Sequence, residues 1–138
     1  MKVTEKDGYL EFYDKSSHEV LLEDSVQIFA MDYIRYNYPD VVAFHVNNEG
    51  KKTIGQARKD QAKGVLKGVS DIMVLIPESR RKGYSFAAIE LKRATKKIAS
   101  TVSEEQKSFL SSVSEAGGFS CVAYGKGGFI AAIKEIIK

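Results

Sequence analysis

Two apolar stretches in the middle of the chain carry charged residues at positions where a buried strand normally carries none. The patterns of residues 68–76 and 86–93 each predict a β-strand. Side chains alternate between the two faces of a strand, so Glu90 and Lys92 share one face, and Asp71 stands near the start of the first strand. Because polar groups in core strands are costly unless they are paired or bind a metal, this trio requires a functional explanation.

The length of the chain predicts a single domain, residues 1–138, that is large enough for a substantial core. No apolar run approaches the roughly 20 residues that span a bilayer, and the first residues lack the apolar core of a signal peptide. A single cysteine, Cys121, excludes an internal disulfide and suits a reducing compartment. We therefore expect a cytoplasmic protein with no membrane association.

Basic residues lie on either side of the charged strands, although the net charge of the whole chain is only +3. They precede the first strand, follow it, and follow the second strand: Lys51, Lys52, Arg58, Lys59, Lys63 and Lys67; Arg80, Arg81 and Lys82; Arg93, Lys96 and Lys97. Each group alone is typical of a solvated face or turn. Their common placement around the acidic residues favours binding to a polyanion.

The first part of the chain predicts a long helix after a short segment of uncertain form. Residues 1–16 are compatible with either a mobile arm or a small hairpin around a turn at residues 6–8. A helix is expected over residues 20–38, with Ser17 as its N-cap and an end at Pro39. Its expected apolar face contains Val20, Leu21, Ile28, Met31 and Ile34. Glu23 and Gln27 are four residues apart and therefore lie on one side of this helix.

The remaining elements alternate between strands and helices. We expect strands at 41–47 and 119–124, in addition to the charged pair, and helices at 53–66, 103–115 and 129–137. The helix at 103–115 starts with a capping-box pattern, in which Ser103 is followed three residues later by Gln106. This order predicts an α/β fold in which helices flank a mixed central β-sheet.

If the two charged strands pair as a hairpin, Asp71 and Glu90 meet at one edge of the sheet. Two carboxylates at one place repel each other unless a cation lies between them. Their hard oxygen atoms favour Mg²⁺, with Mn²⁺ as a substitute. Lys92, on the same face as Glu90, could contact a phosphate or an attacking water. This combination predicts metal-assisted hydrolysis of a polyanionic ester.

An Asp followed at a distance by Glu-x-Lys is similar to the core motif of PD-(D/E)XK nucleases. Further motifs resemble the VRR-NUC (virus-type replication-repair nuclease) family, in its stand-alone form found in bacteria and phages. They are Gly68-Val69-Ser70-Asp71, Ile89-Glu90-Leu91-Lys92, Ser103-x-x-Gln106, Glu23-x-x-x-Gln27 and the loop Asn47-Asn48-Glu49-Gly50. The chain departs from the family at Ser70, where proline is usual.

The resemblance implies a role for each matching residue. Asp71, Glu90 and the backbone carbonyl of Leu91 would be metal ligands, and Glu23 would complete the acidic cluster directly or through a water. Lys92 would position the nucleophilic water, and Gln106 would support the site or touch the substrate. Asn47 and Lys51 would contact the DNA backbone. The implied activity is that of a Mg²⁺-dependent, structure-specific DNA endonuclease, which as a homodimer resolves four-way (Holliday) junctions in branched double-stranded DNA.

Several alternatives stay open at this point. The chain could be a monomeric nuclease that acts on flaps, ends or nicks, a catalytically silent DNA-binding module, or an unrelated α/β binding protein. Gln106 could serve only the cap of its helix. His18 and His45 have no partner at metal-ligand spacing, which favours structural or exposed roles. Gly125-Lys126-Gly127-Gly128 lacks the spacing of a phosphate-binding loop and favours a simple strand-to-helix turn.

Overall fold

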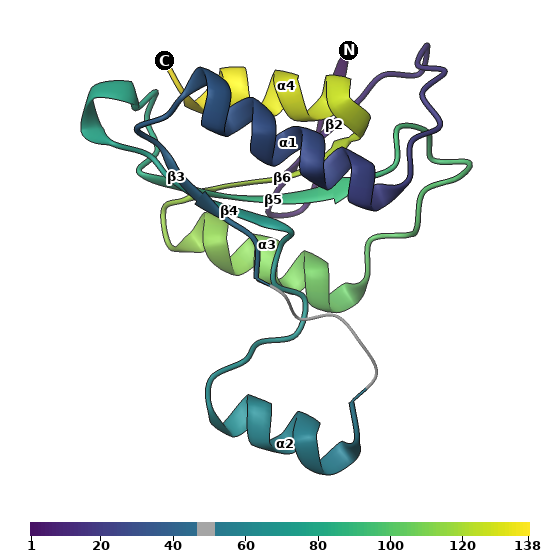
Figure 1. Cartoon of the computed structure of the whole chain (residues 1–138), viewed down its shortest axis with the longest axis vertical. Coiled ribbons are helices and arrows are strands. Elements are labelled where there is room, and N and C mark those ends of the chain that lie inside the picture. The colour runs from purple at the N-terminus through teal and green to yellow at the C-terminus, as the bar shows by residue number, and fades with distance from the viewer. Residues whose placement is uncertain (47–51) are drawn as a thin grey trace.

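The computed structural model describes residues 1–46 and 52–138, which form a mixed six-stranded sheet with helices on both faces (Figure 1). The strand order is β1-β2-β6-β5-β4-β3. The strands are β1 (Lys2–Glu5), β2 (Leu10–Tyr13), β3 (Val42–Phe44), β4 (Ile72–Leu75), β5 (Phe86–Lys92) and β6 (Phe119–Tyr124). The helices are α1 (Glu23–Asn37), α2 (Ile54–Ala62), α3 (Glu104–Glu115), α4 (Gly125–Ile136) and the short 3₁₀ helix η1 (Glu78–Arg80). The predicted α/β class and mixed sheet are thus confirmed.

The N-terminal segment is a hairpin that belongs to the main sheet. β1 pairs with β2 in antiparallel orientation, and the Lys6 N–H donates to the carbonyl of Tyr9 across the turn at 2.8 Å. β2 then pairs with β6 in parallel. Of the two forms expected for residues 1–16, the hairpin is therefore correct and the mobile arm is wrong.

Helix α1 starts three residues later than predicted, and Ser17 is not its N-cap. Leu22 occupies the cap position and offers no side-chain hydrogen bond. The preceding backbone is held elsewhere, because the Arg93 guanidinium donates to the carbonyls of Val20 and Leu21 at 2.8 and 3.0 Å. The core-facing side of α1 consists of Val26, Ala30, Met31 and Ile34, while Val20 and Ile28, assigned to that face from the sequence, are exposed.

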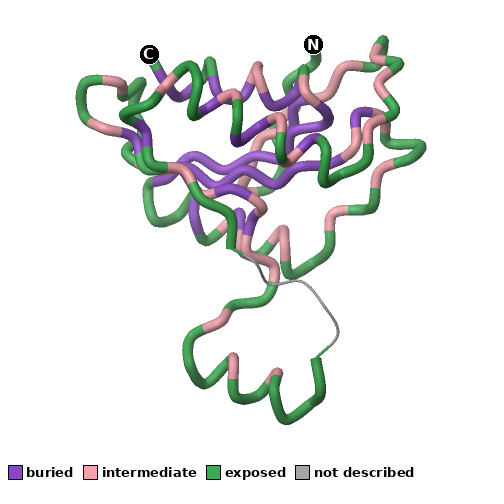
Figure 2. Tube along the Cα trace, viewed as in Figure 1, coloured by how far each residue is buried: buried purple, intermediate pink, exposed green. Residues whose placement is uncertain are grey.

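Three layers build the body of the domain. Helices α1 and α4 cover one face of the sheet and α3 covers the other (Figure 1). The buried residues concentrate in the central strands β5 and β6 and in the sheet-facing sides of these helices (Figure 2). Burial of this apolar surface is the main force that holds the layers together. None of the helices in the described part of the chain combines the length and apolar character needed to cross a bilayer.

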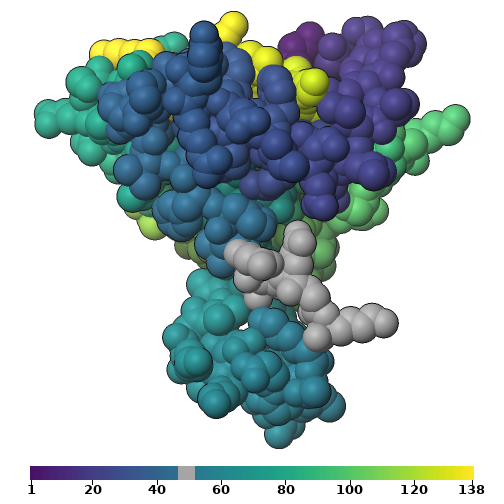
Figure 3. Space-filling model, in the orientation of Figure 1, coloured from purple at the N-terminus to yellow at the C-terminus, as the bar shows by residue number. Residues whose placement is uncertain are grey.

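Helix α2 lies outside this layered body (Figures 1 and 3). Thr53 caps it by accepting a hydrogen bond from the Gln56 N–H, and the helix ends before Gly64, whose φ is +103°. It is therefore shorter than the predicted 53–66. β3 is likewise shorter than the predicted 41–47, as far as the described residues extend.

Candidate active site

Asp71 and Glu90 meet at the end of the sheet where β4 begins and β5 ends. β4 and β5 are antiparallel with Ile72 opposite Ile89, which places Asp71, just ahead of β4, beside Glu90. The Asp71 N–H donates to Glu90 Oε2 at 3.2 Å, and the Leu91 N–H donates to Asp71 Oδ2 at 2.7 Å. Each carboxyl group is thus fixed by the backbone of the opposite strand.

The environment of the two carboxyl groups disfavours two negative charges. Glu90 is 3% exposed, and burial, followed by the nearby Asp71 carboxylate, raises its pKa to about 9. Burial also raises the pKa of Asp71, against the opposing effect of the hydrogen bond from Leu91 N. A divalent cation would offset this repulsion, and buried carboxylate oxygens are the donors that Mg²⁺ prefers. The residues therefore fit a hard divalent metal.

Lys92 is buried at the end of β5 and its ammonium group is directed toward the start of α3. The side chain is 2% exposed. Its Nζ donates to Ser100 Oγ at 2.9 Å and, over longer distances of 3.4 Å, to the Thr101 carbonyl and to Gln106 Oε1. These three acceptors match the three donors of a lysine ammonium. Lys92 is therefore held as an oriented cation beside the Asp71–Glu90 pair.

Gln106 serves both the helix cap and the acidic pair. Its backbone N–H donates to Ser103 Oγ at 3.1 Å and its Oε1 accepts from the Ser103 N–H at 2.9 Å, which completes the predicted capping box of α3. The other end of the same amide, Nε2, donates to Glu90 Oε1 at 2.6 Å. One side chain thus makes both the cap and a contact with Glu90, and a role of Gln106 in the reaction stays a prediction.

A hollow in front of Asp71 brings Glu23 near the site. It is lined by Glu23, Asp24, Gln27, Ile28, His45 and Asp71. Glu23 is the first residue of α1, so its carboxylate also complements the positive end of that helix. Within residues 1–46 and 52–138, no three His, Cys, Asp or Glu side chains form a metal-binding group. The hollow therefore joins Glu23 to Asp71 without a ready-made three-carboxylate cluster, and its role as a ligand stays a prediction.

Three residues near the site have features that the sequence did not predict. His45 is exposed, in agreement with the role that its spacing favoured, and its Nδ1 lies 2.6 Å from the carbonyl oxygen of Asp71. Ser100 is the nearest partner of the Lys92 ammonium. Gln27 has a buried Nε2 with no hydrogen-bond partner in the described part of the chain, and this residue lines the hollow with Asp71. Asn47 and Lys51, the predicted DNA contacts, lie outside the described residues.

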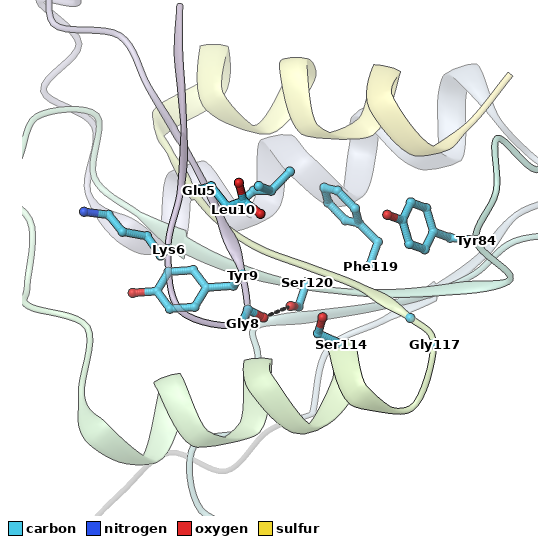
Figure 4. A pocket seen from close by; sticks show the side chains of 11 residues that line it. Glu5, Lys6, Gly8, Tyr9, Leu10, Tyr84, Ser114, Gly117, Phe119 and Ser120 are labelled. Atoms are coloured by element: carbon cyan, nitrogen blue, oxygen red, sulfur yellow. Dashed lines mark hydrogen bonds between the residues drawn. The ribbon is translucent and has the colours of Figure 1, made fainter.

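Figure 4 shows a different pocket, of about 340 Å³, which contains none of these residues. Tyr9, Tyr84 and Phe119 are among the side chains that line it. Phe119 starts β6 opposite Ala87, whereas Lys92 pairs with Tyr124 at the other end of the same strand. The pocket and the acidic site are therefore at opposite ends of β6.

The fold and the site together define a nuclease domain of the PD-(D/E)XK type: an acid ahead of one strand, Glu-x-Lys at the end of its antiparallel neighbour, and helices on both faces of a mixed sheet. The VRR-NUC domain matches residues 14–127, and the chain belongs to the VRR-NUC family. A solved structure described as a VRR_NUC domain protein superposes with a TM-score of 0.65 and 23% identity, over 85% of this chain and 88% of that chain. That likeness confirms the fold. No curated protein sequence matches the chain.

Proposed function

We propose that the chain is a Mg²⁺-dependent DNA endonuclease, with Mn²⁺ as a substitute ion, that cuts phosphodiester bonds in branched double-stranded DNA. The observation that carries the proposal is the buried pair of Asp71 and Glu90 with the Lys92 ammonium fixed on the same face as Glu90. Membership of a nuclease family supports the reaction class. The basic residues that precede β4, among them Arg58, Lys59 and Lys63, support a polyanionic substrate.

Asp71, Glu90 and the backbone carbonyl of Leu91 would hold the ion, and Glu23 is the candidate for a further ligand. When bound, Mg²⁺ lowers the pKa of a coordinated water and neutralises charge that develops on the phosphate. Lys92, whose ammonium is held by Ser100, Thr101 and Gln106, places a fixed positive charge next to this position, where negative charge develops on the phosphate. Gln106 holds the Glu90 carboxyl group in one orientation through its amide N–H.

Each chain carries one such site, so a symmetric cut of two strands requires a second copy. We propose that the chain resolves four-way junctions as a homodimer. A monomeric nuclease that acts on flaps, ends or nicks is the alternative, and the size of the complex with DNA separates the two. Light scattering that detects only monomers, with and without a synthetic junction, would exclude the dimeric resolvase.

The decisive test is cleavage of a synthetic four-way junction in Mg²⁺ by the unaltered protein, Asp71→Asn and Asp32→Asn. Asp32 is an exposed acid on α1 and serves as the matched control. We expect paired incisions from the unaltered protein and from Asp32→Asn, and junction binding without cleavage from Asp71→Asn. Undiminished cleavage by Asp71→Asn would overturn the site assignment, whereas binding without cleavage by all three proteins would favour the silent DNA-binding module.

A further inference from the structure

The positive charge of the chain is concentrated in the segment that contains α2. Residues 52–67, called here the α2 lobe, contain one acidic residue, Asp60, and five basic ones: Lys52, Arg58, Lys59, Lys63 and Lys67. The net charge of the lobe is thus +4, which exceeds the +3 of the whole chain. The remainder, taken together, has a slight negative charge. The single acid is itself engaged, because Asp60 Oδ2 lies 2.7 Å from Lys52 Nζ and Oδ1 accepts from Gln56 at 2.7 Å.

The α2 lobe is not held by a hydrophobic core. None of the residues of α2 is buried, and within the described part of the chain α2 packs against no other helix or strand. The helix has nine residues, a length that is marginal in water without tertiary contacts. Lys59 and Lys63 are one turn apart and repel each other, which weakens the helix further. A polyanion lying against this side would remove that repulsion.

The position of the α2 lobe relates it directly to the active site. The chain leaves the body after His45 and returns to it at Gly68, and the contact between His45 Nδ1 and the Asp71 carbonyl joins the two stems. Gly68 lies against the backbone of Glu105 and Gln106, at the start of α3. The lobe therefore projects from the same end of the strands as Asp71 and Glu90, and it lies outside the layered body (Figures 1 and 3).

The geometry points to the α2 lobe as an arm that binds the phosphate backbone of the DNA duplex next to the cleavage position. This inference rests on the proposed function and deepens it, since it assigns substrate affinity to one element. An acidic site repels the polyanion that it must cut, and a cationic arm at the same edge offsets that repulsion. Nine helical residues extend about 14 Å, at about 1.5 Å per residue, which corresponds to roughly four base pairs of duplex.

The three basic residues Arg58, Lys59 and Lys63 provide the test, because all are exposed and none forms an ion pair with a carboxylate among the described residues. The experiment compares the Asp71→Asn protein with the same protein carrying Arg58→Gln, Lys59→Gln and Lys63→Gln. Binding to a fluorescent duplex of about 30 base pairs and to a four-way junction is measured from about 50 to 300 mM salt. We expect affinity at 100 mM salt to fall about tenfold or more, and the slope of log K against log salt to fall by about 2 to 3 units.

A matched control removes the same number of charges at the opposite end of the molecule. Lys2, Lys134 and Lys138 are exposed in the described structure, and the two termini lie far from α2 (Figure 1). The combined Lys2→Gln, Lys134→Gln and Lys138→Gln variant should lose less than threefold in affinity. Both triple variants should keep the unfolding temperature of their parent, because α2 contributes nothing to the core.

Three results would overturn the inference. Equal losses in the two triple variants would show a general effect of net charge, and unchanged binding by the lobe variant would show that the lobe does not touch DNA. A change of oligomeric state in light scattering, with DNA affinity unaltered, would show that the lobe contacts a second copy. Cleavage assays with Asp71 intact separate these failures from failure of the proposed function. If the protein cuts DNA and the substitutions in the α2 lobe do not change its DNA binding, only the role of the lobe is refuted.

Discussion

Gln106 Nε2 lies 2.6 Å from Glu90 Oε1 while the Oε1 atom of the same amide caps the first turn of α3. One side chain thus couples the start of a helix to a carboxyl group of the candidate site. The coupling is directional, because the amide donates to the acid through nitrogen and accepts from the helix through oxygen. A substitution that keeps the cap of α3 but replaces the hydrogen bond to Glu90 with a repulsive contact can therefore separate the two roles.

Gln106→Glu should retain the capping box, since glutamate serves at this position, but it places a carboxylate against Glu90. We expect α3 to stay folded and cleavage to fall at least a hundredfold. Ser103→Ala is the matched control, because it removes the cap hydrogen bond at a cost of about 1 kcal/mol and leaves the Gln106–Glu90 contact in place. Urea unfolding and single-turnover cleavage are measured for both. Similar cleavage by the two variants would show that the Glu90 contact has no part in the reaction.

Ser100 should act as a positioning residue for Lys92. Ser100→Ala removes the 2.9 Å partner of the ammonium and leaves only the two 3.4 Å contacts. We expect about a tenfold lower cleavage rate with DNA affinity unchanged, and recovery in Ser100→Thr, which restores a hydroxyl. Single-turnover rates and binding titrations measure the two quantities separately. A loss that Ser100→Thr does not restore would indicate a loop defect instead.

The pKa of Glu90 predicts how the metal-free protein responds to pH. A carboxyl group whose pKa is higher in the folded than in the unfolded state stabilises the fold while it is protonated. For Glu90 this stabilisation is complete below about 4.5 and is lost as the pH rises through about 9. The raised pKa of Asp71 acts in the same direction. In EDTA, the free energy of unfolding should therefore decrease between about pH 5 and pH 9.

Glu90→Gln should weaken this pH dependence, and Mg²⁺ should counter it in the unaltered protein, since a bound cation favours the ionised carboxyl groups. Glu115→Gln, a change at an exposed position of α3, is the control and should leave the dependence intact. Urea unfolding at several pH values gives the free energies. The same slope in Glu90→Gln and in the control would contradict the assignment to Glu90.

Local patterns predicted part of the arrangement that the structure shows around Glu90. Alternation along residues 86–93 places Glu90 and Lys92 on one face, and the capping-box spacing locates Gln106, because both patterns depend on neighbours within a few residues. Ser100 was missed because its contact with Lys92 crosses a loop that has no period. The contact of His45 with the Asp71 carbonyl was not predicted, because it depends on how β3 and β4 pair.

The errors at the N-terminal end have the same origin. The parallel pairing of β2 with β6 joins residues more than a hundred positions apart, so no local pattern predicts it. The late start of α1 depends on Arg93, which engages the carbonyls of Val20 and Leu21 from the far end of β5. Apolar spacing alone predicted that the helix includes Val20 and Leu21. Periodicity contains no information about hydrogen-bond donors that are distant in the sequence.

Ser70 has a buried hydroxyl with no hydrogen-bond partner in the described part of the chain, and the residue is 1% exposed. Ser70→Ala should therefore stabilise the fold by about 1 kcal/mol, because it removes an unpaired polar group. Ser120→Ala is the matched comparison: this buried hydroxyl donates to the Gly8 carbonyl at 2.9 Å, and its loss should destabilise by about 1 kcal/mol. Urea unfolding gives both values. Destabilisation by Ser70→Ala would show that the hydroxyl has a partner.

Gly68 should be far less tolerant of alanine than Gly64, although both have a positive φ, of +79° and +103°. A Cβ at Gly68 would lie 2.3 Å from the carbonyl of Glu105, whereas a Cβ at Gly64 would meet no atom within 4 Å. Gly64→Ala should cost about 1 kcal/mol through its backbone conformation alone. Gly68→Ala should cost more than about 3 kcal/mol, because two backbone segments must separate.

The same separation would move the start of α3, and with it Gln106, away from Glu90. Cleavage by Gly68→Ala should therefore fall even at temperatures where the protein remains folded, while Gly64→Ala should cut at nearly the original rate. Circular dichroism melting and single-turnover cleavage at 20 °C give the two measurements. Equal stability of the two variants would show that the backbone of Gly68 does not fix the position of α3.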